Sequence, residues 1–147
     1  NLSGVDSNGG ITKAEFERMG FDSTTHYQFA HFTNMNRDYL EILEDVKRQY
    51  ETIEKNYMKT IYFPHASIGW DNNPRFRRYT EYFARNNTPE NFEKALRMAK
   101  DYLDRHPEQP KLVTLNSWNE WTETSYLEPD DLYGYGYLDA VKRVFGE

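Results

Sequence analysis

The 147-residue sequence predicts an α/β protein with parallel strands. Short apolar segments rich in β-branched and aromatic residues alternate with segments of helical periodicity, and each apolar segment opens into a polar loop. One of these segments, "KLVTL", is apolar on both faces, as strands buried inside α/β proteins are. Consecutive strands of this kind pair in parallel through helical crossovers.

The N-terminal half is predicted to hold two helices and one strand. A short helix is expected from Thr12 to Met19, with Thr12 as N-cap and Glu15 in capping-box spacing. "GFDSTTHYQFAHF" is expected to form a strand that runs into a loop. Residues 36–58 form the clearest helix, because apolar residues recur in steps of three and four at Leu40, Leu43, Val46, Tyr50, Ile53 and Tyr57.

The C-terminal half repeats the strand–loop–helix order twice. "KTIYFPHASIGWDNNPR" is predicted to be a strand that opens into a polar loop. A helix should follow, with Thr88 as N-cap, Pro89 at its first position and one apolar face made by Phe92, Leu96, Ala99 and Leu103. "KLVTLNSWNEW" is the next strand and "GYGYLDAVKRVF" the closing helix, so the order is one helix followed by three βα units.

An open sheet and a closed barrel both fit this order. A (β/α)8 barrel needs about 250 residues, so about three units amount to a C-terminal portion of a TIM barrel, with the N-terminal strands absent. Residues 1–147 are expected to form a single domain, a partial barrel. Its open sheet edges are expected to require the N-terminal part of the barrel or self-association.

Composition narrows the possible partners. A net charge of -6 and a pI near 5.3 argue against nucleic acid. No apolar run approaches the roughly 20 residues that span a bilayer, so membrane insertion is not expected. The lack of cysteine excludes disulfides and a cysteine nucleophile but leaves the compartment open. The aromatic content of 16% fits either a sugar-binding surface or an aromatic core.

The polar loops that follow the three strands are the expected functional region. In α/β folds, the loops at the carboxyl ends of parallel strands converge, and ligands bind there. The candidate residues are His26 and Tyr27 after the first strand, His65, Trp70, Asp71, Asn72 and Arg75 after the second, and Trp118, Asn119, Glu120, Trp121 and Glu123 after the third.

Two of these residues, Glu120 and Glu123, suggest glycoside chemistry. Cleavage of a glycosidic bond usually needs one carboxyl group to protonate the leaving oxygen and a second to assist on the opposite side. A spacing of three puts both on one face of a helical turn. In a site walled by Trp118 and Trp121, repulsion between them would keep one protonated. The alternative is that both glutamates are solvated loop residues and both tryptophans are packing residues.

Three segments resemble a known family. "SWNEWTETSYLEPDDLYGYGYLDAV" resembles the W-N-E-W-x-E-G-x-x-L-E-P signature of the WbsX-type family, which is similar to the endo-α-mannosidases of glycoside hydrolase family 99. "GWDNNPRFRR" resembles the G-W-D-N-T-P-R segment of that family, and "GFDSTTHY" more loosely its G-F-D-A-V stretch. The chain departs from the pattern at Thr124, where glycine is usual, and at Asn73, where threonine is usual.

The resemblance implies a (β/α)8 barrel that cleaves an α-mannoside or related glycan without a metal or other cofactor. It implies that Glu120 deprotonates the 2-hydroxyl of the sugar and that Glu123 acts as general acid and then base, a retaining mechanism. The substrate would be an oligo- or polysaccharide. Its expected contacts are His26, Tyr27, Trp70, Asp71, Asn72, Arg75, Trp118, Asn119, Trp121 and Tyr126.

Other interpretations stay open. Residues 6–16 resemble the second half of an EF-hand loop but lack a leading carboxylate, because Gly4 stands there. His26, His31 and His65 have no metal-ligand spacing. A glycosyltransferase of polysaccharide biosynthesis would need an activated sugar donor, and the sequence has no Gly-rich phosphate loop or DxD motif. A non-catalytic carbohydrate-binding protein is the third possibility.

Overall fold

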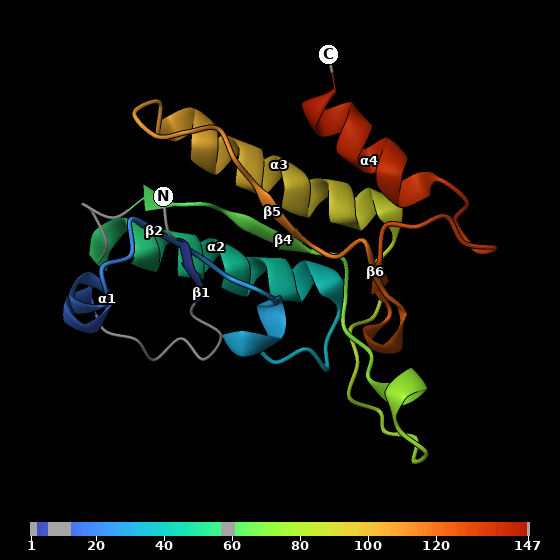
Figure 1. Cartoon of the computed structure of the whole chain (residues 1–147). Helices are drawn as coiled ribbons and strands as arrows, with labels where there is room; N and C mark the ends of the chain where they lie inside the picture. Colours follow the sequence, from blue (N-terminus) through green and yellow to red (C-terminus); the bar gives the residue numbers. More distant parts are fainter. Residues whose placement is uncertain (1–2, 6–12, 57–60, 147) are drawn as a thin grey trace.

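The fold is an alternation of parallel strands and helices, seen in a computed structural model that describes residues 3–5, 13–56 and 61–146 (Figure 1). The main elements, in chain order, are β1 (Ser3–Val5), α1 (Lys13–Met19), β2 (Ser23–Thr25), α2 (Tyr39–Asn56), β3 (Ile61–Tyr62), β4 (His65–Ser67), α3 (Pro89–Arg105), β5 (Thr114–Asn116), β6 (Asn119–Glu120), β7 (Ser125–Tyr126) and α4 (Gly136–Phe145). Three short 3₁₀ turns are η1 (Phe29–His31), η2 (Asn73–Arg75) and η3 (Trp121–Glu123).

The strands lie side by side in chain order and run in the same direction. β1 pairs with β2, β2 with β3, and β4 with β5, all in parallel. Only Phe63 and Pro64 separate β3 from β4. The Phe63 N–H donates to Thr24 at 2.9 Å and the Pro64 carbonyl accepts from Thr114 at 3.0 Å, so hydrogen bonding continues across the break. Proline has no N–H to add to the ladder, which explains the interruption.

The three helices predicted after the first strand are confirmed, with one change to a buried face. On α2, Leu43, Val46, Tyr50 and Ile53 are buried as expected, but Leu40 is 40% exposed and Tyr39 and Ile42 are buried instead. The predicted buried face of α2 was therefore wrong at Leu40, its first residue. Thr88 caps α3, since its hydroxyl accepts from the Asn91 N–H at 3.4 Å, and the four apolar residues predicted for this helix are buried.

The first helix, α1, is also present, and a strand that the sequence pattern did not indicate precedes it. With β3 and β4 counted as the one strand that was predicted there, β1 is a fourth parallel strand in addition to the three that were expected. Its sequence, "SGV", has no apolar run that would reveal a strand. The Thr12 cap, Tyr57 and most of the EF-hand-like run lie outside the described residues.

The core lies between α2, α3 and the strands, and much of the aromatic content is there (Figure 1). Tyr50, Tyr62 and Tyr102 pack edge to face, with ring centroids 5.4–5.8 Å apart. The Tyr50 hydroxyl donates to the His65 carbonyl at 2.7 Å, and that of Tyr39 to the Ser67 carbonyl. These bonds attach α2 to β4. Helix α4 packs against α3.

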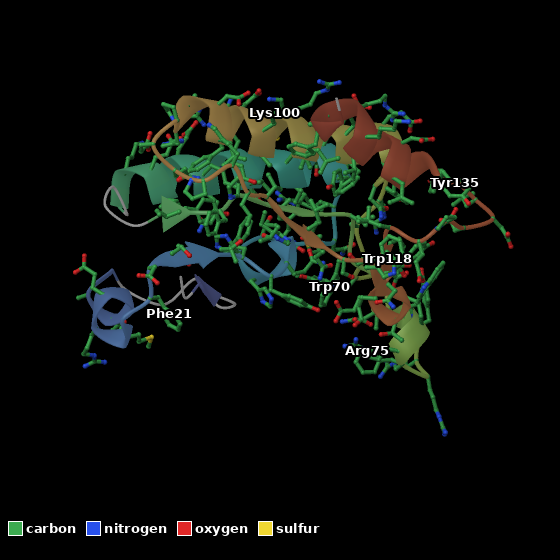
Figure 2. All side chains as sticks on the ribbon, turned by 45° about the horizontal axis from the view of Figure 1, so that its top comes forward. Phe21, Trp70, Arg75, Lys100, Trp118 and Tyr135 are labelled. Atoms are coloured by element: carbon green, nitrogen blue, oxygen red, sulfur yellow. The ribbon has the colours of Figure 1, made fainter. Side chains whose placement is uncertain are left out.

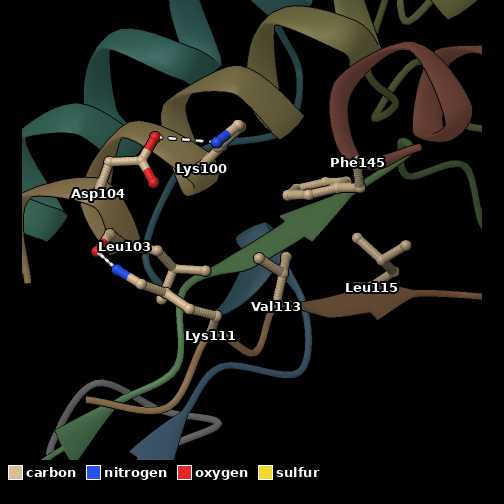
Figure 3. Close-up of a pocket in the computed structure, with 7 residues that line it drawn as sticks. All are labelled: Lys100, Leu103, Asp104, Lys111, Val113, Leu115 and Phe145. Carbon is tan, nitrogen blue, oxygen red and sulfur yellow. Dashed lines mark hydrogen bonds and ion pairs between the residues drawn. The ribbon is translucent and has the colours of Figure 1, made fainter. Parts of the chain in front are cut away.

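The segment leading into β5 is less buried than expected. Leu112 is 45% exposed, and Val113 and Leu115 are only partly buried. The prediction that "KLVTL" is buried on both faces was wrong here, because β5 is the last of the parallel strands and no described strand covers its far side. A pocket of about 330 Å³ lies beside it, lined by Lys100, Leu103, Asp104, Lys111, Val113, Leu115 and Phe145 (Figure 3).

None of the helices in the described part of the chain combines the length and the apolar character needed to cross a membrane.

Candidate functional site

The site is built on a small hairpin that follows β5. β6 and β7 pair antiparallel, with Asn119 opposite Tyr126 and Glu120 opposite Ser125. The 3₁₀ turn η3 joins them and contains Glu123. Glu123 therefore lies in a helical turn, whereas Glu120 is the last residue of β6 and precedes that turn. In Figure 1 the hairpin and the loop after β4 lie at the same end of the molecule, and their turns η2 and η3 are in contact.

The hairpin depends on an unusual backbone conformation at Thr124. This residue ends η3 with φ 51° and ψ 39°, in the left-handed region. β-branched side chains rarely adopt that region, whereas glycine does so without steric cost. The glycine that the WbsX-type signature has at this position therefore matches the turn, and threonine is accommodated in the same geometry.

One arginine brings the two candidate carboxylates together. Arg75 Nη1 lies 3.1 Å from Glu123 Oε1, and Arg75 Nη2 lies 3.3 Å from Glu120 Oε1. Because both oxygens contact one planar guanidinium, they are no more than about 9 Å apart. That limit includes the separations used by both retaining and inverting glycosidases.

The environments of the two carboxylates differ. The Glu123 side chain is 8% exposed and that of Glu120 is 34% exposed. Burial raises the pKa of Glu123 above its usual value, the nearby Arg75 charge lowers it, and Glu120 raises it further. Since burial is the largest of these causes, Glu123 holds a proton more strongly than an ordinary glutamate.

The loop after β4 is attached directly to this turn. The Asp71 N–H donates to the Glu123 carbonyl at 2.9 Å, and the Thr124 hydroxyl donates to the Asp71 carbonyl at 3.3 Å. The Asp71 side chain accepts from the Asn73 main chain and side chain at 2.8 and 2.7 Å, so it supports the loop. Asn72 is half-buried beside it. Figure 2 places Trp70, Arg75 and Trp118 at the same end of the molecule.

The tryptophans are more exposed than a closed hollow would require. Trp118 is 55% exposed and Trp121 is 43% exposed. One face of the Trp121 ring stacks on Tyr126 at 3.7 Å, and its indole N–H donates to Glu128 at 2.7 Å. The expectation that two indoles enclose both carboxylates was therefore wrong. Trp118 and the outer face of Trp121 instead offer apolar ring surface beside the pair, and Asn119 is exposed next to them.

Two residues of the first loop lie in different surroundings. The His26 ring is buried, 2.9 Å from the Tyr62 hydroxyl and packed edge to face with Phe32. These are the surroundings of a core side chain. Tyr27 is 46% exposed, with its ring 5.9 Å from that of His31. Their assignment to a substrate stays a prediction.

A buried polar network lies beneath the site and was not foreseen. Gln28 Nε2 donates to the Gly69 carbonyl at 3.0 Å and to Asn116 Oδ1 at 2.9 Å. Ser125 Oγ donates to the same Asn116 oxygen at 2.5 Å. The network joins the ends of β4 and β5 to the first loop and to β7. No local pattern could have revealed these partners, because they are up to 88 positions apart in the chain.

Thr122 is a second residue that the sequence did not single out. Its hydroxyl accepts from Arg75 Nη2 at 2.9 Å and donates to Glu120 Oε1 at 2.5 Å. It therefore fixes the relative positions of Arg75 and Glu120.

Across the described ranges, no group of three or more His, Asp or Glu side chains is placed to hold a metal ion.

Comparison with known proteins identifies the family. The family described as glycosyltransferase WbsX matches residues 6–141. The chain belongs to this family. Two curated proteins from two strains of Xanthomonas campestris pv. campestris, both named uncharacterized protein WxcX, are 32% identical to this chain over 94 residues. The match covers 56% of the chain and 12% of each relative, so the WbsX chain spans only a small part of these proteins.

Solved structures show the same fold. A glycoside hydrolase-like protein matches with a TM-score of 0.64 at 20% identity, over 86% of the WbsX chain and 38% of its own. The GH99 endo-alpha-mannosidase from Bacteroides thetaiotaomicron matches in two structures, with TM-scores of 0.61 and 0.59 at 13% identity. These two matches cover 100% and 99% of the WbsX chain, and 46% and 45% of the mannosidase. The family match confirms the resemblance to the WbsX-type family, and the solved structures confirm an α/β fold with parallel strands. Which portion of a barrel the chain supplies stays a prediction.

Proposed function

We propose that this chain supplies the acid–base centre of a carbohydrate-active enzyme that hydrolyses α-mannoside or related glycan linkages with retention of configuration. The main support is the unequal pair of carboxyl groups on one turn: Glu123 is buried and its pKa is raised, while Glu120 is partly exposed and contacts the same guanidinium. Family membership and the likeness to glycoside hydrolase folds agree with this proposal.

The division of labour is the one that the family resemblance implies, and the unequal environments of the two carboxyl groups support it. Glu123, whose pKa is raised by burial, donates a proton to the leaving glycosidic oxygen. Glu120 accepts the proton of the sugar 2-hydroxyl, whose oxygen then attacks the anomeric carbon and displaces the leaving group to give a 1,2-anhydro sugar. Water next opens this ring at the anomeric carbon. Glu123 takes the proton of that water, and Glu120 returns its proton to the 2-oxygen.

The surface around the pair suits a sugar chain. Aromatic rings stack on the apolar faces of pyranoses, and Trp118 and Trp121 are exposed next to Glu120. Asn119, exposed between them, can donate hydrogen bonds to sugar hydroxyls. The barrel portion would act as a single domain that requires the remaining strands of a barrel or a second copy. If the 147-residue chain alone is a folded monomer in solution, that requirement is wrong.

A glycosyltransferase is the second candidate, because the family description names that activity. The same two carboxyl groups could then activate an acceptor hydroxyl and stabilise charge. A transferase requires an activated sugar donor and gives a longer glycan, whereas a hydrolase needs only water. A binding protein without catalysis would retain a glycan and release no product.

The test is a glycan-array screen of the full-length polypeptide, followed by product analysis by NMR with and without activated sugar donors. Glu120→Gln and Glu123→Gln should each lower turnover of the selected glycan by several orders of magnitude, because each removes one proton-transfer step. Glu108→Gln is the matched control, since Glu108 is exposed in the turn after α3. Full turnover in both site variants would exclude the hydrolase.

A further inference from the structure

Arg75 occupies a position that a simple substrate contact would not need. Its guanidinium uses Nη1 for Glu123 and Nη2 for Glu120, while Nε and Nη2 both donate to the Thr122 hydroxyl, at 3.2 and 2.9 Å. The guanidinium nitrogens Nε, Nη1 and Nη2 therefore each contact a side chain of β6 or η3. A lysine ammonium, a compact point charge, could not span the two carboxyl groups in the same way.

The loop that presents Arg75 is fixed by Asn73. The Asn73 amide donates to Asp71 Oδ1 at 2.7 Å and to the Thr80 carbonyl at 2.9 Å, and its oxygen accepts from the Thr80 N–H at 2.7 Å. The Arg75 N–H donates to the Asn72 carbonyl at 3.0 Å, which closes the turn η2. The guanidinium is therefore held against η3 by a structured loop.

The contact between Arg75 and the two glutamates joins one positive charge to two negative groups. Glu123 and Glu120 are two negative groups, and Arg75 is the positive group bonded to both. Asp71, whose main-chain N–H donates to the Glu123 carbonyl, uses its carboxylate to accept two bonds from Asn73. Glu123 Oε1 is bonded to Arg75, whereas Glu123 Oε2 is buried without a hydrogen-bond partner among the described residues. Oε2 is thus the atom left to carry a proton or to meet a ligand.

We infer that Arg75 is a positioning residue for the carboxylate pair: its guanidinium holds the two carboxyl groups at a fixed separation and controls which of them is protonated. This inference rests on the proposed function, because it concerns the same two glutamates. It assigns Arg75 to the catalytic pair, where the sequence had suggested a contact with the glycan. Removing the positive charge leaves the buried Glu123 beside Glu120 alone, so Glu123 must bind its proton more tightly.

The test is a carbon-13 NMR titration of glutamate carboxyl groups in the full-length polypeptide, with the Glu123 signal assigned by its loss in Glu123→Gln. Arg75→Met should raise the midpoint of the Glu123 titration by about one pH unit or more. Arg75→Gln, which is neutral but can still form hydrogen bonds, should give the same rise and serves if the methionine variant does not fold. Arg78→Met, an exposed change in the same basic run, is the control and should leave the midpoint unchanged.

The outcomes separate this inference from the proposed function. An unchanged midpoint in the Arg75 variants overturns the inference, even if the glycan is still hydrolysed. A raised midpoint together with no turnover of any glycan by the wild type supports the positioning role and counts against the hydrolase. If both hold, the pH optimum of turnover should move to higher pH in Arg75→Gln, as the titration does.

Discussion

Gln28 offers the sharpest test of how the site is supported, because one buried side chain joins three strand ends. It is fully buried and makes three hydrogen bonds: from Nε2 to Gly69 and Asn116, and from the Phe29 N–H to its Oε1 at 2.7 Å. Gln28→Met keeps a similar volume and removes all three. At about 1 kcal/mol for each bond, the full loss is about 3 kcal/mol.

Two of the three groups that lose a bond to Gln28 keep a second hydrogen-bond partner, which reduces the expected loss of stability. The Phe29 N–H also donates to Ser67 Oγ at 3.1 Å, and Asn116 Oδ1 also accepts from Ser125. Only the Gly69 carbonyl depends on Gln28 for its side-chain bond. We therefore expect Gln28→Met to lower the free energy of unfolding by about 2 to 3 kcal/mol.

The assay is urea unfolding of the wild type and the variant, followed by circular dichroism, with the slope compared as well as the midpoint. Gln49→Met on the partly exposed side of α2 is the control and should change the free energy of unfolding by less than about 0.5 kcal/mol. A Gln28→Met variant within about 0.5 kcal/mol of the wild type would show that the network contributes nothing measurable, contrary to this expectation.

Two further predictions concern the turn itself. Thr124→Gly should be more stable than Thr124→Ala by about 1 kcal/mol in the same urea assay. Both variants lose the bond from the Thr124 hydroxyl to the Asp71 carbonyl, and glycine adopts φ 51° without the steric cost that alanine has there, so equal stabilities would contradict this. Glu123→Gln should remove the contribution of Glu123 to the pH dependence of the free energy of unfolding. The raised pKa of Glu123 means that its protonated form is favoured in the folded state, so this stabilisation is complete below the ordinary value of 4.5 and is lost as pH rises through the folded value. From pH 4 to pH 8 the variant should therefore gain stability relative to the wild type, and parallel curves would be evidence against a buried, protonated Glu123.

The helices could be predicted from the sequence because their signals are local. The Thr88 cap, the proline after it and the apolar face of α3 all lie within one segment, and the structure has each of them. The spacing of the two glutamates was compatible with a helical turn, and the structure has Glu123 in such a turn with Glu120 just before it. The glycine that the family has at position 124 is compatible with a left-handed backbone conformation there, although only the structure shows that Thr124 adopts this conformation.

The remaining features depend on contacts between distant segments. β1 has three residues without an apolar pattern, and only its pairing with β2 makes it a strand. The exposure of Leu112 depends on which strands flank β5. The role of Arg75 depends on a loop 45 positions away from Glu120, so a sequence could suggest a site contact but not a shared guanidinium.

The most direct test of the account is a crystal structure of the full-length polypeptide, made inactive by Glu123→Gln, with a bound oligosaccharide. We predict that a glycosidic oxygen lies within hydrogen-bond distance of residue 123, with the 2-hydroxyl of the adjoining sugar facing Glu120 and a pyranose ring on Trp118 or Trp121. A glycan seated elsewhere, for instance in the pocket beside β5 lined by Val113 and Phe145, would contradict the assignment of this carboxylate pair.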